Sequence, residues 1–332
     1  MKTRSFFGNG GQFMVTSRDQ IEKVISNIEQ VVVGKRKEVE LSLIALFAGG
    51  HVLLEDVPGV GKTMMVKAIA RSLGAEFKRI QFTPDLLPSD VTGVSIYNQR
   101  SQQFEFRPGP IMANIVLADE INRTSPKTQS ALLESLEEGS VTVDGETLQL
   151  EKPFFVMATQ NPIEYAGTFP LPEAQLDRFL LKLNLGYPSA MEELEVLNRL
   201  QHRHPLESLE AVMSTNEVIA IQTEMTNILV SEEVKMYMVD LVHETRRHRS
   251  VELGVSPRGT IALMKASQAY AFLQGREYVI PDDVKHLAPY VLAHRMMLTA
   301  ESRMSNRTAE EVVHSILEHV SIPVNQRRLT RS

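Results

Sequence analysis

Asp56-Val57-Pro58-Gly59-Val60-Gly61-Lys62-Thr63 is the stretch that decides the fold of this chain. An apolar run, 51–54, leads into it, and a run with helical propensity, 64–73, follows it. A strand that turns through glycines into a helix directs backbone N–H groups and the positive end of the helix dipole to one point. The stretch therefore predicts a phosphate-binding loop, in which Lys62 reaches the β- and γ-phosphates and the Thr63 hydroxyl ligates Mg²⁺.

The loop departs from the pattern G-x-x-x-x-G-K-[ST] at its first position, where Asp56 replaces the expected glycine. Gly59 and Gly61 still keep the backbone tight beside the phosphates. Taken alone, the octet fits an ordinary strand–turn–helix corner equally well. The prediction of a phosphate-binding loop therefore depends on the motifs that follow. Its predicted nucleotide contacts are Pro58, Gly59, Val60, Gly61, Lys62, Thr63 and Met64.

Composition limits the possible functions of the chain. It has 332 residues, a formal net charge of −6 and a pI near 5.9, a balance that does not favour nucleic acid or an anionic membrane surface. The absence of Cys excludes disulfides and thiolate metal sites and fits a reducing compartment. The longest stretch without a charged side chain, 41–54, is shorter than the roughly 20 residues of a spanning helix. We expect a cytoplasmic protein without a membrane span.

Apolar runs that alternate with helical patterns predict an α/β fold with a parallel sheet. Continuous apolar runs are typical of strands that are buried on both faces. The five expected strands are 51–54, 77–82, 115–120, 154–158 and 179–185. Two hairpins are also expected, at 94–106 and at 141–148. For the first hairpin, a plain surface ribbon and a contact with a client protein are equally open.

The pattern changes after Pro188. Capping boxes begin at Ser189, Ser214 and Thr308, and apolar residues recur at helical spacing without strand-like alternation. At the start of the chain, Ser17-x-x-Gln20 matches a capping box, so we expect a flexible N-terminus over 1–15 and a first helix capped at Ser17. A nucleotide-binding domain over 16–188 and a C-terminal all-helical lid domain over 189–332 should follow.

Polar side chains follow two of the predicted strands. Asp119 and Glu120 end a buried strand, and the carboxyl ends of parallel strands are where open α/β sheets bind ligands. Asp119 is placed to hold Mg²⁺, and Glu120 to orient or deprotonate an attacking water. Asn161 follows the next strand and offers an amide to the γ-phosphate or to that water, although a turn residue before Pro162 is the simpler interpretation on its own.

Two arginines are candidates for stabilising transition-state charge. Arg178 opens the last predicted strand, where it could also simply pair with Asp177 or Glu173. Arg258 lies in the first turn of a lid helix that is capped by Ser256. Because basic side chains usually occupy helix C-termini, its position hints at an external anion.

Together these motifs resemble the MoxR family of AAA+ ATPases, and the resemblance extends over nearly the whole chain. The stretches that carry it are 56–63, 81–90, 109–110, 117–123, 158–162, 171–179 and 256–259. The resemblance implies a five-stranded P-loop AAA+ core in the order 5-1-4-3-2 with a helical lid. It also implies ATP and Mg²⁺ as ligands and ATP hydrolysis as the activity.

The resemblance assigns a role to each candidate residue. Lys62 and Thr63 match the Walker A pair, and Asp119 and Glu120 match the Walker B pair. Asn161 corresponds to sensor 1, Arg178 to the arginine finger that acts on the next subunit, and Arg258 to sensor 2. The stretch beside adenine corresponds to Val32, Val33 and Gly34, and Arg123 is a second candidate at the subunit interface.

The family further implies a ring, typically a hexamer, that remodels or assembles client proteins together with a von Willebrand factor A domain protein. Three alternatives stay open at this stage. A magnesium-chelatase-like subunit shares the same AAA+ branch, and a nucleotide-bound switch would hydrolyse ATP slowly. A nucleic-acid motor is disfavoured by the acidic balance, since the one dense basic run, 246–249, fits a solvated helix face better.

Overall fold

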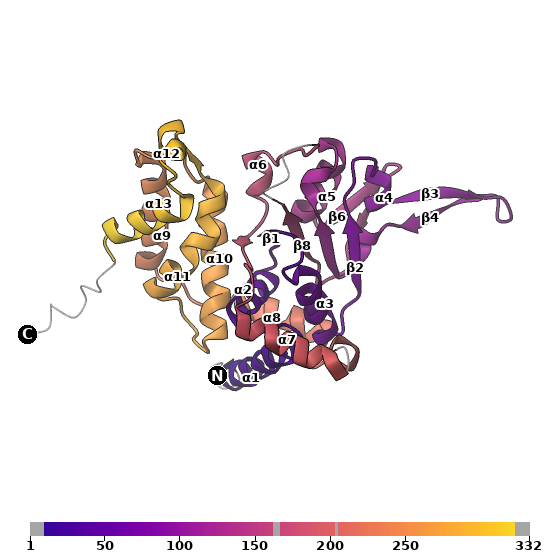
Figure 1. Cartoon of the computed structure of the whole chain (residues 1–332), viewed down its shortest axis with the longest axis horizontal. Helices are drawn as coiled ribbons and strands as arrows, with labels where there is room; N and C mark the ends of the chain where they lie inside the picture. The colour runs from indigo at the N-terminus through magenta and orange to yellow at the C-terminus, as the bar shows by residue number, and fades with distance from the viewer. Residues whose placement is uncertain (1–9, 162–166, 203–204, 323–332) are drawn as a thin grey trace, which may run out of the picture. The chain divides into compact units, whose positions relative to one another are not determined.

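The structure, a computed structural model, describes residues 10–161, 167–202 and 205–322. The chain forms two compact units that divide between Thr223 and Glu224 (Figure 1). The first unit contains the sheet, and the second consists mainly of helices. None of the helices within the described ranges combines the length and the apolar character that crossing a bilayer requires.

Five parallel strands form the central sheet of the first unit. They are β1 (Val52–Glu55), β2 (Phe77–Gln81), β5 (Ile115–Asp119), β8 (Phe155–Gln160) and β9 (Leu181–Leu183). Their spatial order is β9-β1-β8-β5-β2, which is 5-1-4-3-2 when the five strands are counted along the chain. The expected order is therefore confirmed, and the register aligns Gln81 with Asp119 and Leu54 with Thr159.

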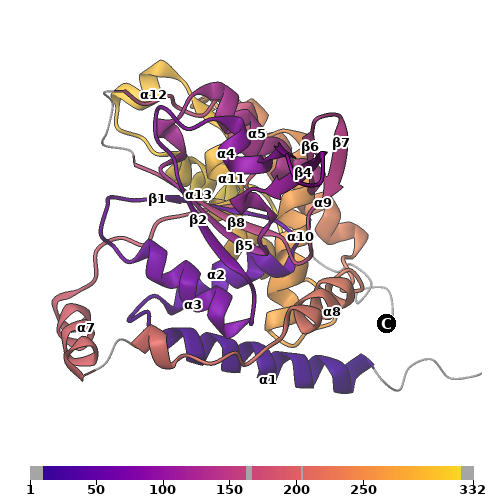
Figure 2. The same ribbon diagram turned by 90° about the vertical axis from the view of Figure 1, so that its right-hand side faces the viewer.

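Helices cover both faces of this sheet, as Figure 2 shows. On one face, Leu132, Leu133 and Leu136 of α5 share a core with alternate residues of β5 and β8. Helices α2 and α3 pack on the other face. The helices of this unit are α1 (Gly10–Glu29), α2 (Arg36–Phe47), α3 (Lys62–Ser72), α4 (Pro88–Thr92), α5 (Pro126–Glu138), α6 (Glu173–Leu176), α7 (Ala190–His202) and α8 (Thr215–Met225), the last of which ends beyond the division.

Both predicted hairpins are present. The first pairs β3 (Gly93–Asn98) with β4 (Gln103–Pro108) and projects from the first unit (Figure 1). The second pairs β6 (Ser140–Val143) with β7 (Glu146–Gln149). Asp144 and Gly145 form its turn with φ of 52° and 85°, the positive values that an Asp-Gly turn supplies at low steric cost.

The second unit contains α9 (Glu232–Arg247), α10 (Pro257–Leu273), α11 (Pro281–Leu292), α12 (Ala300–Met304) and α13 (Ala309–His319). It also contains a small antiparallel pair, β10 (Val251–Leu253) with β11 (Met297–Leu298), so this region is not wholly helical. Strands of two or three residues are too short to show the alternation that predicts a strand.

The structure places two boundaries differently from the sequence-based expectation. Helix α1 begins at Gly10, so Ser17 lies inside the helix, and the flexible segment expected over 1–15 overlaps its first residues. The division between compact units lies at 223/224 rather than at 188, because the segment after the sheet packs on the first unit. Arg199 donates to the carbonyl oxygens of Glu29 and Gln30, and Gln222 donates to that of Leu46.

His51 joins the sheet to a helix immediately before β1. Its Nδ1 accepts from the backbone N–H of Val156 at 3.1 Å, and its Nε2 lies 3.2 Å from the carbonyl oxygen of Leu136. Burial lowers the pKa of His51 to about 4, although the hydrogen bond to Leu136 opposes that shift. The folded chain therefore holds this ring neutral.

We expect acid to destabilise the protein through His51. As the pH falls, the unfolded chain takes up a proton on His51 before the folded chain does. The contribution of the neutral ring to the free energy of unfolding is therefore present above pH 6.5 and falls by about 3 kcal/mol as the pH drops towards 4. The His51→Gln variant does not titrate at this position. The difference in urea unfolding free energy between wild type and variant should therefore narrow from pH 7 to pH 4, and a constant difference would contradict this account.

Candidate functional site

The phosphate loop joins β1 to α3 at the carboxyl edge of the sheet. Gly59 and Gly61 have φ of 89° and 92°, conformations that other residues adopt only with strain. Helix α3 begins at Lys62, so the N–H groups of its first turn, which have no partner within the helix, lie next to the loop. Lys62 Nζ donates to the carbonyl oxygen of Asp56 at 2.9 Å, which folds the side chain back over its own loop.

Asp56 explains the departure from the glycine pattern. Its side chain is buried, and its two carboxylate oxygens accept the backbone N–H groups of Leu185 at 2.5 Å and Gly186 at 3.0 Å. These N–H groups lie just beyond β9, the neighbour of β1 in the sheet. The carboxylate thus ties the start of the phosphate loop to the chain that leaves the edge strand.

The Asp56→Ala variant should destabilise the protein by about 3 kcal/mol, because two backbone donors lose a charged acceptor inside the protein. Asp56→Asn keeps one acceptor oxygen and should lose less. Thermal unfolding of both variants measures the difference. A melting temperature of the Ala variant equal to that of the wild type would show that the carboxylate does not fasten the loop.

Asp119 ends β5 and is held by two side chains. The hydroxyl of the buried Thr159 donates to Asp119 Oδ1 at 2.6 Å, and Arg79 forms an ion pair with Oδ2 at 2.6 Å. Thr159 also accepts the backbone N–H of Glu120 at 2.8 Å. One threonine on β8 therefore positions both members of the acidic pair.

Glu120 follows with a left-handed backbone, φ 58° and ψ 50°. Its Oε2 accepts from Gln81 Nε2 at 2.8 Å and from Arg123 Nη1 at 2.9 Å. A non-glycine residue in this region is unusual and often marks a functional site. At Glu120 the chain turns away from the direction of β5. The carboxylate of Glu120 therefore lies between Gln81 of β2 and Arg123 of the segment that follows β5.

Electrostatics connect the loop to the acidic pair. Burial lowers the pKa of Lys62, and the charges of Asp119, Asp56 and Glu120 raise it. These three carboxylates therefore act on the same ammonium group. The structure brings Lys62, Asp119 and Glu120 together at one edge of the sheet, as the sequence predicts.

The other candidate residues lie in different surroundings. Asn161 is buried just after β8, and its carbonyl oxygen accepts from Asn122. Arg178 pairs with Glu137 of α5 at 3.2 Å, a partner that the sequence did not suggest. Arg258 belongs to the second unit, in the first turn of α10, where the hydroxyl of Ser256 accepts its backbone N–H.

An apolar cavity of about 100 Å³ adjoins the start of α3. Met64 and Val33 line this cavity, whereas Val32 is buried in the core and Gly34 turns with φ 71°. The remaining lining residues are Val31, Val196, Arg199, Leu200 and Pro205. Its lining is mostly apolar, and its volume is below the roughly 300–1,000 Å³ that is typical of ligand sites.

Sequence reasoning did not assign roles to several of these groups. Arg79 and Gln81 alternate along β2 and therefore share one side of the strand, a signal that could have placed both beside the acidic pair. Val196 and Leu200 are one helical turn apart on α7. Their contribution could not be found from spacing, because more than 130 residues separate them from Met64.

Comparisons with known proteins agree with this geometry. A family model described as the ATPase family associated with various cellular activities (AAA) matches residues 51–181, and an AAA lid domain model matches residues 243–316. An uncharacterised protein of Bacillus subtilis, YeaC, is 64% identical over 304 residues, which are 92% of this chain and 95% of YeaC.

The chaperone MoxR1 of Mycobacterium tuberculosis is 41% identical over 323 residues, 95% of this chain and 85% of MoxR1. A solved structure of a candidate ATPase from Cytophaga hutchinsonii aligns with a TM-score of 0.88 at 40% identity, covering 94% of this chain and 97% of that one. With the phosphate loop, the acidic pair and the sheet order in place, these matches show that the chain is an ATPase of the MoxR family of AAA+ proteins.

Proposed function

We propose that the chain hydrolyses ATP to ADP and phosphate at the carboxyl edge of the sheet. The observation that carries this proposal is the convergence of Lys62, Asp119 and Glu120 at this edge. The charges of both carboxylates act on the ammonium group of Lys62. Phosphoryl transfer requires chiefly positioning and charge neutralisation. Lys62 neutralises the β- and γ-phosphates, and Glu120 orients and deprotonates the attacking water, with Asn161 beside the γ-phosphate.

The same edge fits a magnesium ion. Thr63, in the first turn of α3, and the buried Asp119 offer the hard oxygen ligands that Mg²⁺ takes, and the ion would neutralise charge on the phosphates. Arg79 now occupies Oδ2 of Asp119. Direct ligation by that oxygen therefore requires Arg79 to move away, whereas ligation through a water leaves the ion pair intact.

We infer that the active site is completed by a neighbouring subunit in a ring, which we propose is a hexamer. Arg178 is directed to Glu137, while the acidic pair is contacted by Arg79, Gln81, Arg123 and Thr159. Glu137 is not part of the acidic pair, and we propose that Arg178 exchanges it for the nucleotide of the next subunit. Arg258 is proposed to contact the nucleotide from the second unit.

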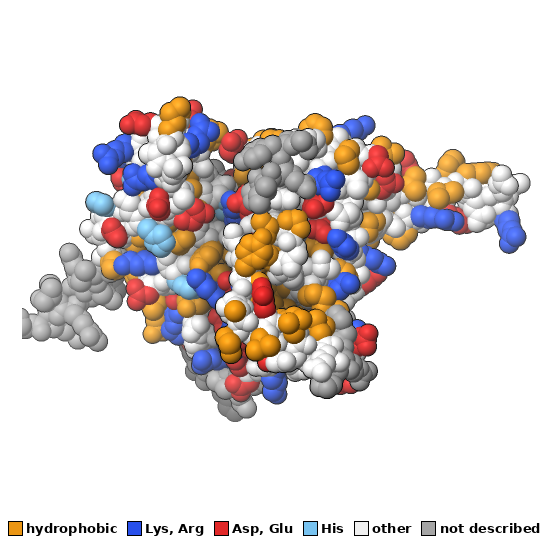
Figure 3. Space-filling model, viewed as in Figure 1, with side chains coloured by type: hydrophobic (Ala, Val, Ile, Leu, Met, Phe, Trp, Pro, Cys, Tyr) orange, Lys and Arg blue, Asp and Glu red, His pale blue; other side chains and the backbone are white. Residues whose placement is uncertain are grey.

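We further propose that the ring remodels or assembles client proteins in the cytoplasm, with a von Willebrand factor A domain protein as partner. The β3–β4 hairpin supports contact with a client. Its Val94, Ile96, Tyr97 and Phe104 are exposed, and hydrophobic side chains are visible on the projecting ribbon in Figure 3. Exposed apolar side chains on one projecting element are typical of a protein-binding surface.

The Lys62→Ala variant tests the nucleotide site directly. It should abolish ATP binding, because the loop loses the cation that reaches the β- and γ-phosphates. Calorimetric titration with ATP gives the affinity, and Lys67→Ala on the same helix is the matched control. Normal ATP affinity of the Lys62 variant would contradict the proposed site.

A further inference from the structure

A second cavity of about 370 Å³ lies within the second unit, far along the chain from the phosphate loop. Its residues come from the C-terminal end of α9, the turn after α12, and α13. They are Glu244, Arg247, His248, Arg249, Arg307, Ser315, Ile316 and His319. Lys, Arg and His side chains, with acidic ones among them, lie over the region of α12 and α13 in Figure 3. We propose that this cavity binds a phosphate group carried by a small molecule or by a phosphorylated side chain.

The charges of the cavity favour an anion. The lining includes three arginines, Arg247, Arg249 and Arg307, and one acidic residue, Glu244. Within the described residues, the side chains of Arg247 and Arg249 have no hydrogen-bond or ion-pair partner. Guanidinium groups gathered in one concavity repel one another unless an anion lies between them. The planar guanidinium matches the oxygens of a phosphate in pairs.

A buried serine orients two of the donors. Ser250 is 4% exposed, and its hydroxyl accepts from Arg307 Nη1 at 3.0 Å. Its backbone N–H donates to Nδ1 of His248 at 3.2 Å. The position of Arg307 is therefore fixed before a ligand arrives, which lowers the entropy that binding has to overcome.

His248 is arranged as a neutral donor. Since its Nδ1 accepts a hydrogen bond, the proton of the neutral ring lies on Nε2. Burial lowers the pKa of His248, and the charges of Arg307, Arg249 and His319 lower it further, against the opposing effect of Glu244. A bound phosphate would cancel part of this positive field. Binding should therefore raise the pKa of His248.

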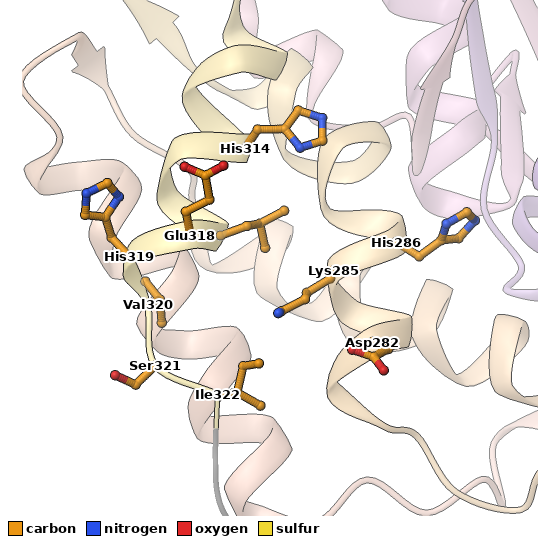
Figure 4. Close-up of a pocket in the computed structure, with 10 residues that line it drawn as sticks. Asp282, Lys285, His286, His314, Glu318, His319, Val320, Ser321 and Ile322 are labelled. Atoms are coloured by element: carbon orange, nitrogen blue, oxygen red, sulfur yellow. The ribbon is translucent and has the colours of Figure 1, made fainter.

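The neighbouring cavity provides a contrast inside the same unit. It has a volume of about 700 Å³, and its Lys285 is accompanied by the carboxylates of Asp282 and Glu318. His319 borders both cavities and lies on the opposite side of the larger one from His286 (Figure 4). Mixed charge favours neither an anion nor a cation, and the described residues include no group of three ligands that could hold a metal ion there.

Nucleic acid fits the basic cavity less well than a single phosphate group does. None of its lining residues is a Phe, Tyr or Trp on which a base could stack. The basic side chains surround one concavity rather than a stripe that follows a phosphate backbone. The whole chain also carries a net charge of −6.

The experiment is a titration of the full chain with inorganic phosphate, followed through the ring signals of isotopically labelled histidines. The Lys62→Ala background removes phosphate binding at the nucleotide site. Phosphate should shift the signals of His248 and raise its pKa while leaving those of His51 unchanged. The Arg307→Ala and Arg249→Glu variants should each weaken binding about tenfold. Lys285→Ala, in the neighbouring cavity, should bind as the background does.

One further ligand identifies the source of the phosphate. A phosphoserine peptide that binds more tightly than inorganic phosphate assigns the group to a partner protein, and equal affinities assign it to a small molecule. Unchanged affinity in both arginine variants, with melting temperatures equal to that of the background, would overturn the proposal. So would a single-stranded oligonucleotide that binds more tightly than phosphate and loses its affinity in Arg249→Glu.

Discussion

Replacing Glu120 by Gln is expected to leave ATP binding intact and to slow turnover by at least about a hundredfold. The amide occupies nearly the volume of the carboxylate and can still accept from Gln81 and Arg123, so the turn after β5 should persist. It cannot take a proton from the attacking water. Calorimetric titration gives the ATP affinity, and release of inorganic phosphate gives the turnover.

The matched control for this experiment is Glu138→Gln, the same chemical change at an exposed position near the end of α5. It should leave both quantities at their wild-type values. If the Glu120 variant retained turnover within about twofold of the wild type, another group would have to act as the base. If it instead lost ATP affinity, its carboxylate would serve binding rather than chemistry.

The central features of the site could be predicted because each is local in the sequence. Lys62 and Thr63 follow a strand and two glycines, and Asp119 and Glu120 end a run that is buried on both faces of the sheet. Parallel strands bring their carboxyl ends to one edge, so two local patterns are enough to place these groups together. The strand order itself came from the family resemblance and not from the pattern of apolar residues.

Other features depend on contacts between distant segments, which no local pattern encodes. The ion pair of Arg79 with Asp119 joins neighbouring strands 40 residues apart. The carboxylate of Asp56 accepts from Gly186, 130 residues further along the chain. The helices after Pro188 look like a separate domain in the sequence, yet their packing on α1 and α2 moves the division between units to 223/224.

Replacing Arg178 by Ala should lower turnover by about 10³ to 10⁵ and leave ATP affinity near the wild-type value, because an arginine finger acts on the transition state. In the structure its guanidinium is paired with Glu137, and its Nε is buried without a hydrogen-bond partner in the described residues. The proposal therefore requires Arg178 to exchange Glu137 for the phosphates of the next subunit when the ring forms. Turnover should accordingly rise with protein concentration.

Mixing two inactive variants distinguishes action on a neighbour from action within one chain. An equal mixture of Arg178→Ala and Glu120→Gln should recover activity, because about a quarter of the interfaces then join an intact Glu120 to an intact Arg178. If both residues served the same chain, every site would keep one defect and the mixture would stay inactive. Lys62→Ala mixed with Glu120→Gln is the control. Those two residues lie on one side of the interface, so no mixed interface combines an intact pair, and recovery there would rule out the division of the site between subunits.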